Sequence, residues 1–163
     1  MIKYNSLIII PARGGSKGIP RKNIRPLSGY PLIYYAIKAS KESSINSDII
    51  VSTDDDKINT VASYFGADVL MRPNHLAKDN ITLDPVIENC LKHIEKKNKK
   101  KYDYIFTVQP TCPLIIGKDI DKAFLNLVNS DADSIITVVE KKHLFWHIHS
   151  EKIKPFYSKR LNR

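Results

Sequence analysis

One stretch of the sequence, LIIIPARGGSKGIPRKN at residues 7–23, indicates how the chain is built. Its first four residues are all apolar and mostly β-branched, which is typical of a strand buried on both faces of a parallel sheet. Pro11 ends this run, and a loop rich in glycine and positive charge follows. Because buried parallel strands need helices on both sheet faces, we expect the rest of the chain to alternate strands with helices.

The remaining sequence shows this alternation. Largely apolar runs predict further strands at 49–52, 67–71, 104–108 and 134–139. Apolar residues at helical spacing predict helices that begin at Pro31, at the aspartates 54–56 with an end at Gly66, at the pair Asp84-Pro85, and at Lys118. The apolar face expected for the first helix consists of Leu32, Tyr35, Ala36 and Ala39. This order predicts an α/β fold, a Rossmann-like open sheet that is mostly parallel, with helices on both faces.

The composition is that of a globular protein with one domain of ordinary size. Of the 163 residues, 42% are hydrophobic and 26% are charged, which excludes an intrinsically disordered chain. No apolar run approaches the roughly 18 residues of a membrane helix, and no signal peptide is recognisable. The two cysteines, Cys90 and Cys112, form no disulfide framework. We therefore expect a cytoplasmic protein without a membrane partner.

Positive charge is concentrated in two places. The formal net charge is +9, and one concentration is the lysine run 96–101, which we interpret as a solvated helix end or loop. The other lies in the glycine-rich loop, defined here as residues 11–25, with Arg13, Lys17, Arg21, Lys22 and Arg25. A nucleic-acid binder would also be basic, but no helix-turn-helix, zinc finger or aromatic RNA-binding pattern accompanies the charge. We therefore expect no nucleic-acid partner.

The glycine-rich loop has the composition of a polyphosphate-binding site. Three glycines within the five residues 14–18 let the backbone approach an anion and direct its N–H groups inward. Arg13, Lys17 and Lys22 add charges that can follow phosphate oxygens. The loop matches neither the Walker pattern nor the dinucleotide fingerprint, and a flexible turn with solvated basic residues is the alternative. We favour the phosphate site, because ligands of open α/β sheets bind beyond the carboxyl ends of the strands.

Residues 8–23 resemble the N-terminal signature of the acylneuraminate cytidylyltransferases, also called CMP-sialic acid synthetases. Further matches follow in order at 31–33, at 51–54, and at Arg72-Pro73 with Leu76-Ala77 and Asp79. The segment Gln-Pro-Thr-Cys-Pro-Leu at 109–114 also matches, with Cys112 in place of the family's usual serine. The resemblance extends from Leu7 to about Val139, and it implies the fold of the nucleotide-diphospho-sugar transferases.

The resemblance implies a nucleotidyltransferase that moves CMP from CTP to the anomeric hydroxyl of a nonulosonic, sialic-acid-like sugar acid and releases pyrophosphate, with Mg²⁺ as cofactor. Such a reaction needs the phosphate charges neutralised. By resemblance, the catalytic residues that hold the triphosphate are Arg13, Lys17 and Lys22. The nucleotide-binding residues are Ala12, Arg13, Gly14, Gly15, Ser16, Lys22, Asn23 and Arg72. Gln109 would contact the sugar acid, and the metal ligands are not identified.

Several of these residues have a simpler alternative role. Arg72 could only form an ion pair with a nearby acid at the sheet edge. Gln109 could only satisfy backbone groups at a strand end, and Asp54 could only cap the second helix. These alternatives place the side chains differently, so a structure can separate them.

The chain is expected to comprise a nucleotide-binding α/β domain, residues 1–140, and an extension, residues 141–163. The extension is rich in apolar residues, which favours contact with a second subunit of a homodimer. His143, His147 and His149 lack enough acidic or cysteine neighbours to predict a metal site. The family's Asn-Gly-Ala-Ile-Tyr segment and its metal-binding Asp-x-Asp pair have no counterpart after Val139. The alternative is therefore a truncated nucleotide-binding module with impaired catalysis.

Overall fold

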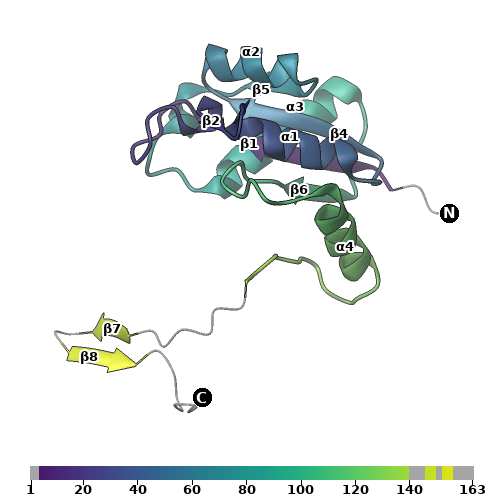
Figure 1. The fold of residues 1–163 in the computed structure, drawn as a ribbon. Helices are drawn as coiled ribbons and strands as arrows, with labels where there is room; N and C mark the ends of the chain where they lie inside the picture. Colours follow the sequence, from purple (N-terminus) through teal and green to yellow (C-terminus); the bar gives the residue numbers. More distant parts are fainter. Residues whose placement is uncertain (1–3, 140–145, 150–151, 156–163) are drawn as a thin grey trace. The chain divides into compact units, whose positions relative to one another are not determined.

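The computed structural model describes residues 4–139, 146–149 and 152–155 (Figure 1). Contacts divide the chain into two compact units, Met1–Asp133 and Ser134–Arg163. The first unit holds the main sheet and the four α-helices of the described residues, and the second holds a short hairpin. None of these helices combines the length and the apolar character needed to cross a membrane.

Four parallel strands form the sheet of the first unit. They are β1 (Ser6–Pro11), β4 (Ser47–Thr53), β5 (Asp68–Met71) and β6 (Tyr104–Thr107), in the order β5-β4-β1-β6. β1 pairs with β4, where Ile8 lies opposite Ile49, and with β6, where Ile8 lies opposite Phe106. Each of the residues 7–10 is 0% exposed. The prediction of a buried parallel strand at this position is confirmed.

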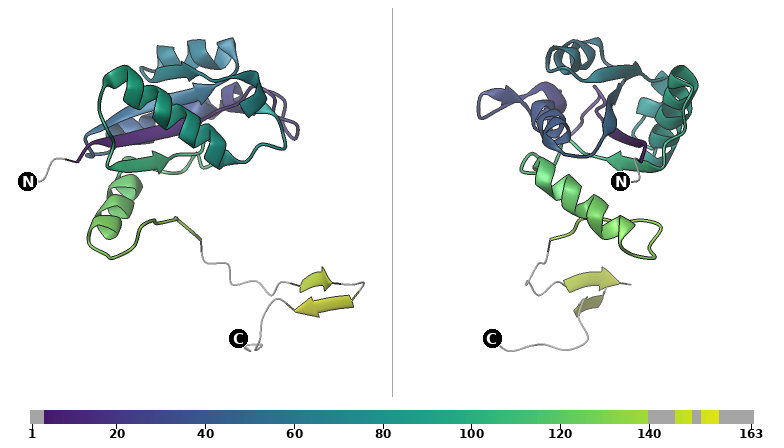
Figure 2. Two further views of the ribbon diagram at one scale, coloured as in Figure 1. Left: turned by 180° about the vertical axis from the view of Figure 1, so that it is seen from behind. Right: turned by 90° about the vertical axis from the view of Figure 1, so that its right-hand side faces the viewer.

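Helices cover both faces of this sheet. They are α1 (Leu32–Glu42), α2 (Asp56–Tyr64), α3 (Leu83–Asn98) and α4 (Gly117–Val128). Side chains of β1 alternate between the faces, so Ile8 and Ile10 pack with residues of α1, α2 and α4, whereas Leu7 and Ile9 pack with residues of α3. Figure 2 shows α3 on the face turned away from α1. The predicted α/β fold is therefore confirmed.

The buried face of α1 agrees with the predicted one at Ala36 and Ala39 and differs at the other two positions. The helix buries Ile33 and Ile37, which were not predicted, while Leu32 and Tyr35 are only partly buried. The Tyr35 hydroxyl donates a hydrogen bond of 2.5 Å to the carbonyl oxygen of Leu27, in the small hairpin of β2 (Pro26–Leu27) and β3 (Tyr30–Pro31). This contact keeps the Tyr35 ring at the edge of the core, and α1 instead turns the side of the helix that carries Ile33 and Ile37 into the core.

Two predicted elements also differ in the structure. α3 begins at Leu83, after Thr82, and not at the pair Asp84-Pro85. Proline is tolerated there because the N–H groups of the first helical turn have no partner within the helix. Residues 134–139 form no strand, and all of them are exposed. A strand needs a neighbour to bond with, and no described strand pairs with this run, so its apolar composition was a misleading signal.

The second unit contains a hairpin that was not predicted. Its strands are β7 (Trp146–His149) and β8 (Lys152–Pro155), and Ile148 lies opposite Ile153. Of the three histidines considered as metal ligands, His143 lies outside the described residues. The expected contact of residues 141–163 with a second subunit stays a prediction.

Within the first unit, α4 is held against the end of α1 by a close backbone approach. A Cβ atom added to Gly117 would lie 2.5 Å from the carbonyl carbon of Glu42 and 2.6 Å from the nitrogen of Ser43. Asp121 accepts hydrogen bonds from the Ser43 hydroxyl at 2.5 Å and from the Ser44 N–H at 2.9 Å. This docking therefore requires a residue without a side chain at position 117.

We expect Gly117→Ala to lower the free energy of unfolding by about 1–3 kcal/mol. The added methyl group would overlap with backbone atoms of Glu42 and Ser43, so α4 would have to move away from the end of α1. Urea unfolding followed by circular dichroism measures the change. Gly18→Ala is the matched control, since a Cβ atom at Gly18 meets nothing within 4 Å. Equal stabilities of the Gly117→Ala variant and the unmodified chain would contradict the close approach.

Candidate functional site

A cavity of about 710 Å³ lies at the carboxyl ends of β1 and β6. β4 and β5 lie on one side of β1 and β6 lies on the other, so the strand order reverses here. Open α/β sheets bind ligands at such a position. The cavity brings together seven of the predicted site residues, namely Arg13, Ser16, Lys17, Lys22, Asn23, Arg72 and Gln109.

The other three predicted residues, Ala12, Gly14 and Gly15, do not line the cavity. The Ala12 N–H donates a hydrogen bond of 2.9 Å to the carbonyl oxygen of Ser52, which ties the loop to the end of β4. The Gly14 N–H donates to Asp54 at 3.1 Å, and a Cβ atom at Gly14 would lie 2.6 Å from an Asp55 carboxylate oxygen. Ala12 and Gly14 therefore fix the path of the loop in this structure.

Asp54 and Asp55, which follow β4, have separate roles. Asp55, not Asp54, caps α2, because its carboxylate accepts hydrogen bonds from the N–H groups of Lys57 at 2.8 Å and Ile58 at 3.1 Å. Asp54 instead accepts from the Gly14 N–H and contacts Arg72 at 3.4 Å. The alternative in which Asp54 only caps the second helix is therefore wrong.

Arg72 is a buried cation at the wall of the cavity. Its side chain is 4% exposed, and its backbone N–H bonds to Thr53 at 2.7 Å, which fixes it beside the end of β4. Burial lowers the pKa of the Arg72 guanidinium, and the Asp54 carboxylate opposes this effect. Nε has no hydrogen-bond partner among the described residues. The ion pair with Asp54 thus accounts for only one donor of Arg72, and an unpaired buried N–H favours a ligand there.

Asp79 holds two of the predicted phosphate-binding side chains. One of its oxygens lies 2.9 Å from Nη1 of Arg13, and the other lies 2.6 Å from Nζ of Lys17. The hydrogen bond from Lys17, together with the charge of Arg13, holds the pKa of Asp79 below its usual value, so the carboxylate is ionised at neutral pH. Asp79 matches the family's sequence, but no role could be predicted for it because nothing in the local sequence shows which cations it meets.

The remaining predicted residues lie on different walls of the cavity. Asn23 is 5% exposed, and its side-chain N–H donates a bond of 2.9 Å to the Arg13 carbonyl oxygen. Lys22 begins the short 3-10 helix η1 (Lys22–Ile24) and is partly buried. Gln109 is exposed after β6, and within the described chain its side chain bonds to no backbone group. The simpler role proposed for Gln109 is therefore not seen.

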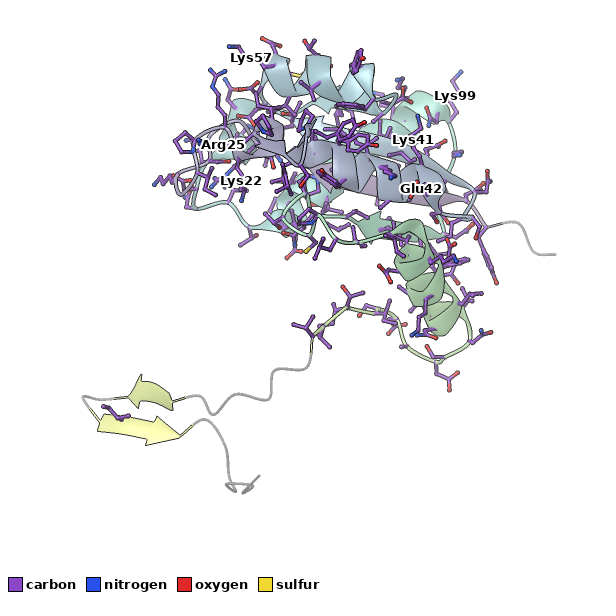
Figure 3. The ribbon with its side chains drawn as sticks, in the orientation of Figure 1. Lys22, Arg25, Lys41, Glu42, Lys57 and Lys99 are labelled. Carbon is purple, nitrogen blue, oxygen red and sulfur yellow. The ribbon has the colours of Figure 1, made fainter. Side chains whose placement is uncertain are left out.

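The lysine run 96–101 lies away from this cavity. Figure 3 shows Lys22 and Arg25 at one end of the sheet and Lys99 at the opposite end. α3 ends at Asn98, and the lysines that follow include Lys100, which pairs with Asp48 at 2.8 Å. The interpretation of this run as a solvated helix end is confirmed, so the two concentrations of positive charge do not form one surface.

The chemistry of the cavity is that of an anion-binding site. Its basic side chains include Arg13, Lys17, Lys22 and Arg72, and the carboxylate among its lining residues is Asp79. Cys90 contributes no nucleophile, because burial raises the pKa of its thiol to about 12. Cys112 is exposed in the turn after Gln109.

Two known proteins show substantial sequence similarity to the chain. It is 33% identical over 136 residues to the pseudaminic acid cytidylyltransferase of Campylobacter jejuni, which covers 83% of this chain and 58% of that protein. It is 35% identical over 139 residues to N-acylneuraminate cytidylyltransferase A of Danio rerio, which covers 85% of this chain and 31% of that protein. The chain therefore spans little more than half of the bacterial relative.

A solved structure of a CMP:2-keto-3-deoxy-manno-octonic acid synthetase complexed with CTP shares the fold. Its TM-score is 0.63 at 23% identity, and the match covers 78% of this chain and 49% of that one. The family model described as cytidylyltransferase matches residues 7–152, a range that contains all the predicted site residues. The chain belongs to the cytidylyltransferase family.

Proposed function

We propose that the chain binds CTP in the 710 Å³ cavity and forms the nucleotide-binding part of an enzyme that transfers CMP to a nonulosonic sugar acid. The observation that carries this proposal is the convergence of Arg13, Lys17, Lys22 and Arg72 on one cavity where the strand order reverses. The names of the bacterial and fish relatives, both sugar-acid cytidylyltransferases, support the same reaction.

The basic residues of the glycine-rich loop would act on the triphosphate. In the reaction the anomeric hydroxyl of the sugar acid loses its proton to solvent and its oxygen attacks the α-phosphorus, and the bond from this phosphorus to the bridging oxygen of the β-phosphate breaks. The electron pair of that bond leaves with pyrophosphate, so negative charge grows on the leaving group. Arg13, Lys17 and Lys22 would stabilise this charge, which is the main contribution a protein makes to such a transfer.

The nucleoside would lie beside Arg72 and Asn23. The free Nε donor of Arg72 suits the carbonyl oxygen or ring nitrogen of cytosine, which both accept hydrogen bonds. The Asn23 amide already donates to Arg13, so its oxygen remains to accept from an amino group such as that of cytosine. Gln109, after β6, would contact the sugar acid from the other side of β1.

Magnesium is the proposed cofactor, and the described residues do not form a complete site for it. Mg²⁺ prefers six oxygen ligands in octahedral geometry. No group of three potential ligands occurs in the part of the chain that the structure describes, and Asp54 is already engaged by Gly14 and Arg72.

We propose a homodimer in the cytoplasm, because the extension 141–163 is rich in apolar residues and the two cysteines form no disulfide framework. A module that binds nucleotide with impaired catalysis is the alternative function. Pyrophosphate release from CTP and Mg²⁺ with a panel of nonulosonic acids separates the two. CTP binding without release for any acid would favour the module.

Because the oxygen of Asn23 can accept from the amino group of cytosine, where uracil has a carbonyl oxygen, we expect CTP to bind at least about tenfold more tightly than UTP, which corresponds to about 1.4 kcal/mol. Isothermal titration calorimetry on the unmodified chain measures both affinities. Equal affinities would show that Asn23 does not read the base.

We expect Arg13→Ala and Lys22→Ala each to weaken CTP binding by about tenfold or more, because a charge-assisted hydrogen bond contributes about 1.5–3 kcal/mol. CMP lacks the β- and γ-phosphates, so its affinity should change much less. Lys118→Ala removes an exposed lysine of α4 and serves as the control for net charge. Similar losses for CMP and CTP would mean that these side chains do not hold the outer phosphates.

A further inference from the structure

Asp79 places a carboxylate against two cations of the proposed triphosphate site. Its two oxygens take different partners, Arg13 at 2.9 Å and Lys17 at 2.6 Å, so the carboxylate bridges them as a phosphate group could. The cations belong to the loop after β1, whereas Asp79 follows the 3-10 helix η2 (Asn74–Ala77). The contact therefore joins two segments of the chain that are far apart in sequence.

Neither pair is fixed by burial. The side chain of Asp79 is 44% exposed, that of Arg13 is 34% exposed and that of Lys17 is 79% exposed. Exposed ion pairs contribute little to the stability of a fold, so stability does not explain why these two ion pairs are present. They can also separate and reform without disturbing the core. The Arg13 guanidinium keeps a second, longer contact of 3.4 Å with the Ala77 carbonyl oxygen.

We propose that Asp79 is an internal anion that occupies Arg13 and Lys17 in the empty site and is displaced by the polyphosphate chain of the nucleotide. This inference rests on the proposed function, because it assumes that the glycine-rich loop binds phosphates. Asp79 holds both cations at the cavity until a ligand arrives. Any competing anion must therefore break the two contacts of the Asp79 carboxylate before it can bind Arg13 and Lys17.

This exchange costs every anion that binds both Arg13 and Lys17 the same two ion pairs. A single phosphate on Arg13 and Lys17 replaces two exposed ion pairs, so it gains less affinity than it would from two free cations. A polyphosphate that also reaches Lys22 gains a contact that Asp79 does not occupy, since the carboxylate contacts only the other two cations. Asp79 thus weakens the binding of every anion that uses Arg13 and Lys17, and a triphosphate recovers affinity through its contact with Lys22.

The test compares the Asp79→Asn variant with the unmodified 163-residue chain. Asparagine keeps the shape of the side chain but cannot neutralise Arg13 and Lys17. We expect tripolyphosphate and inorganic phosphate to bind roughly three- to tenfold more tightly, because two exposed ion pairs no longer compete. Cytidine, which has no phosphate, should bind equally to both proteins. Calorimetry at fixed ionic strength measures the affinities.

Two further variants separate local competition from other effects. Asp68→Asn changes the net charge equally at an exposed position in β5 that is not part of the cavity, and it should leave tripolyphosphate binding unchanged. In a Lys17→Ala background one of the two ion pairs is already lost, so the gain from Asp79→Asn should shrink. A residue with a merely structural role would show no such dependence on Lys17.

An unchanged or weaker affinity of the Asp79→Asn variant for tripolyphosphate would overturn the inference, because Asp79 would then support the site and not compete for it. Failure of both proteins to bind tripolyphosphate would overturn it as well. These outcomes differ from failure of the proposed function. Tripolyphosphate carries no base, so equal affinities for CTP and UTP would leave the result on Asp79 standing.

Discussion

The complete burial of β1 between two strands and two layers of helices is the constraint on which the rest of the structure depends. Residues 7–10 are each 0% exposed, and burying a side chain of this size stabilises the fold by roughly 1.5–3 kcal/mol. A shift of β1 by one residue would exchange its two faces, so the register is firmly set. The end of β1 at Pro11 is therefore a fixed point, and the glycine-rich loop starts from it.

Because of the strand order, three segments of the chain surround the end of β1 and form the site. The loop after β1 lies between the segment after β5, which carries Arg72, and the segment after β6, which carries Gln109. In the proposed reaction the phosphates would lie at the centre, with the base on one side and the sugar acid on the other. The sugar acid would then approach the α-phosphorus of CTP from the side opposite the base, which brings the attacking oxygen close to the atom that it attacks.

Two aspartates balance the positive charge of this site in different ways. Asp54 is 17% exposed in its side chain and accepts from the Gly14 N–H, so it joins the glycine-rich loop to Arg72 as part of the framework. Asp79 is more exposed and meets side chains that can move, so it can yield to a ligand. The same residue type thus supports the backbone at one position and competes with phosphate at the other, because burial differs.

The sequence by itself determined the features that depend on near neighbours. The apolar run at 7–10, the glycine at the end of α2 and the basic loop after β1 follow from local patterns, and the family resemblance supplied seven residues that the structure brings to one cavity. Only the tertiary structure decided which apolar stripe of α1 faces the sheet and that residues 134–139 form no strand. It also decided that Asp55 caps α2, which leaves Asp54 to Arg72, and that Asp79 meets Arg13 and Lys17. These outcomes depend on residues that are distant in sequence. An interaction between two such residues stabilises the structure only after the sheet has brought them together.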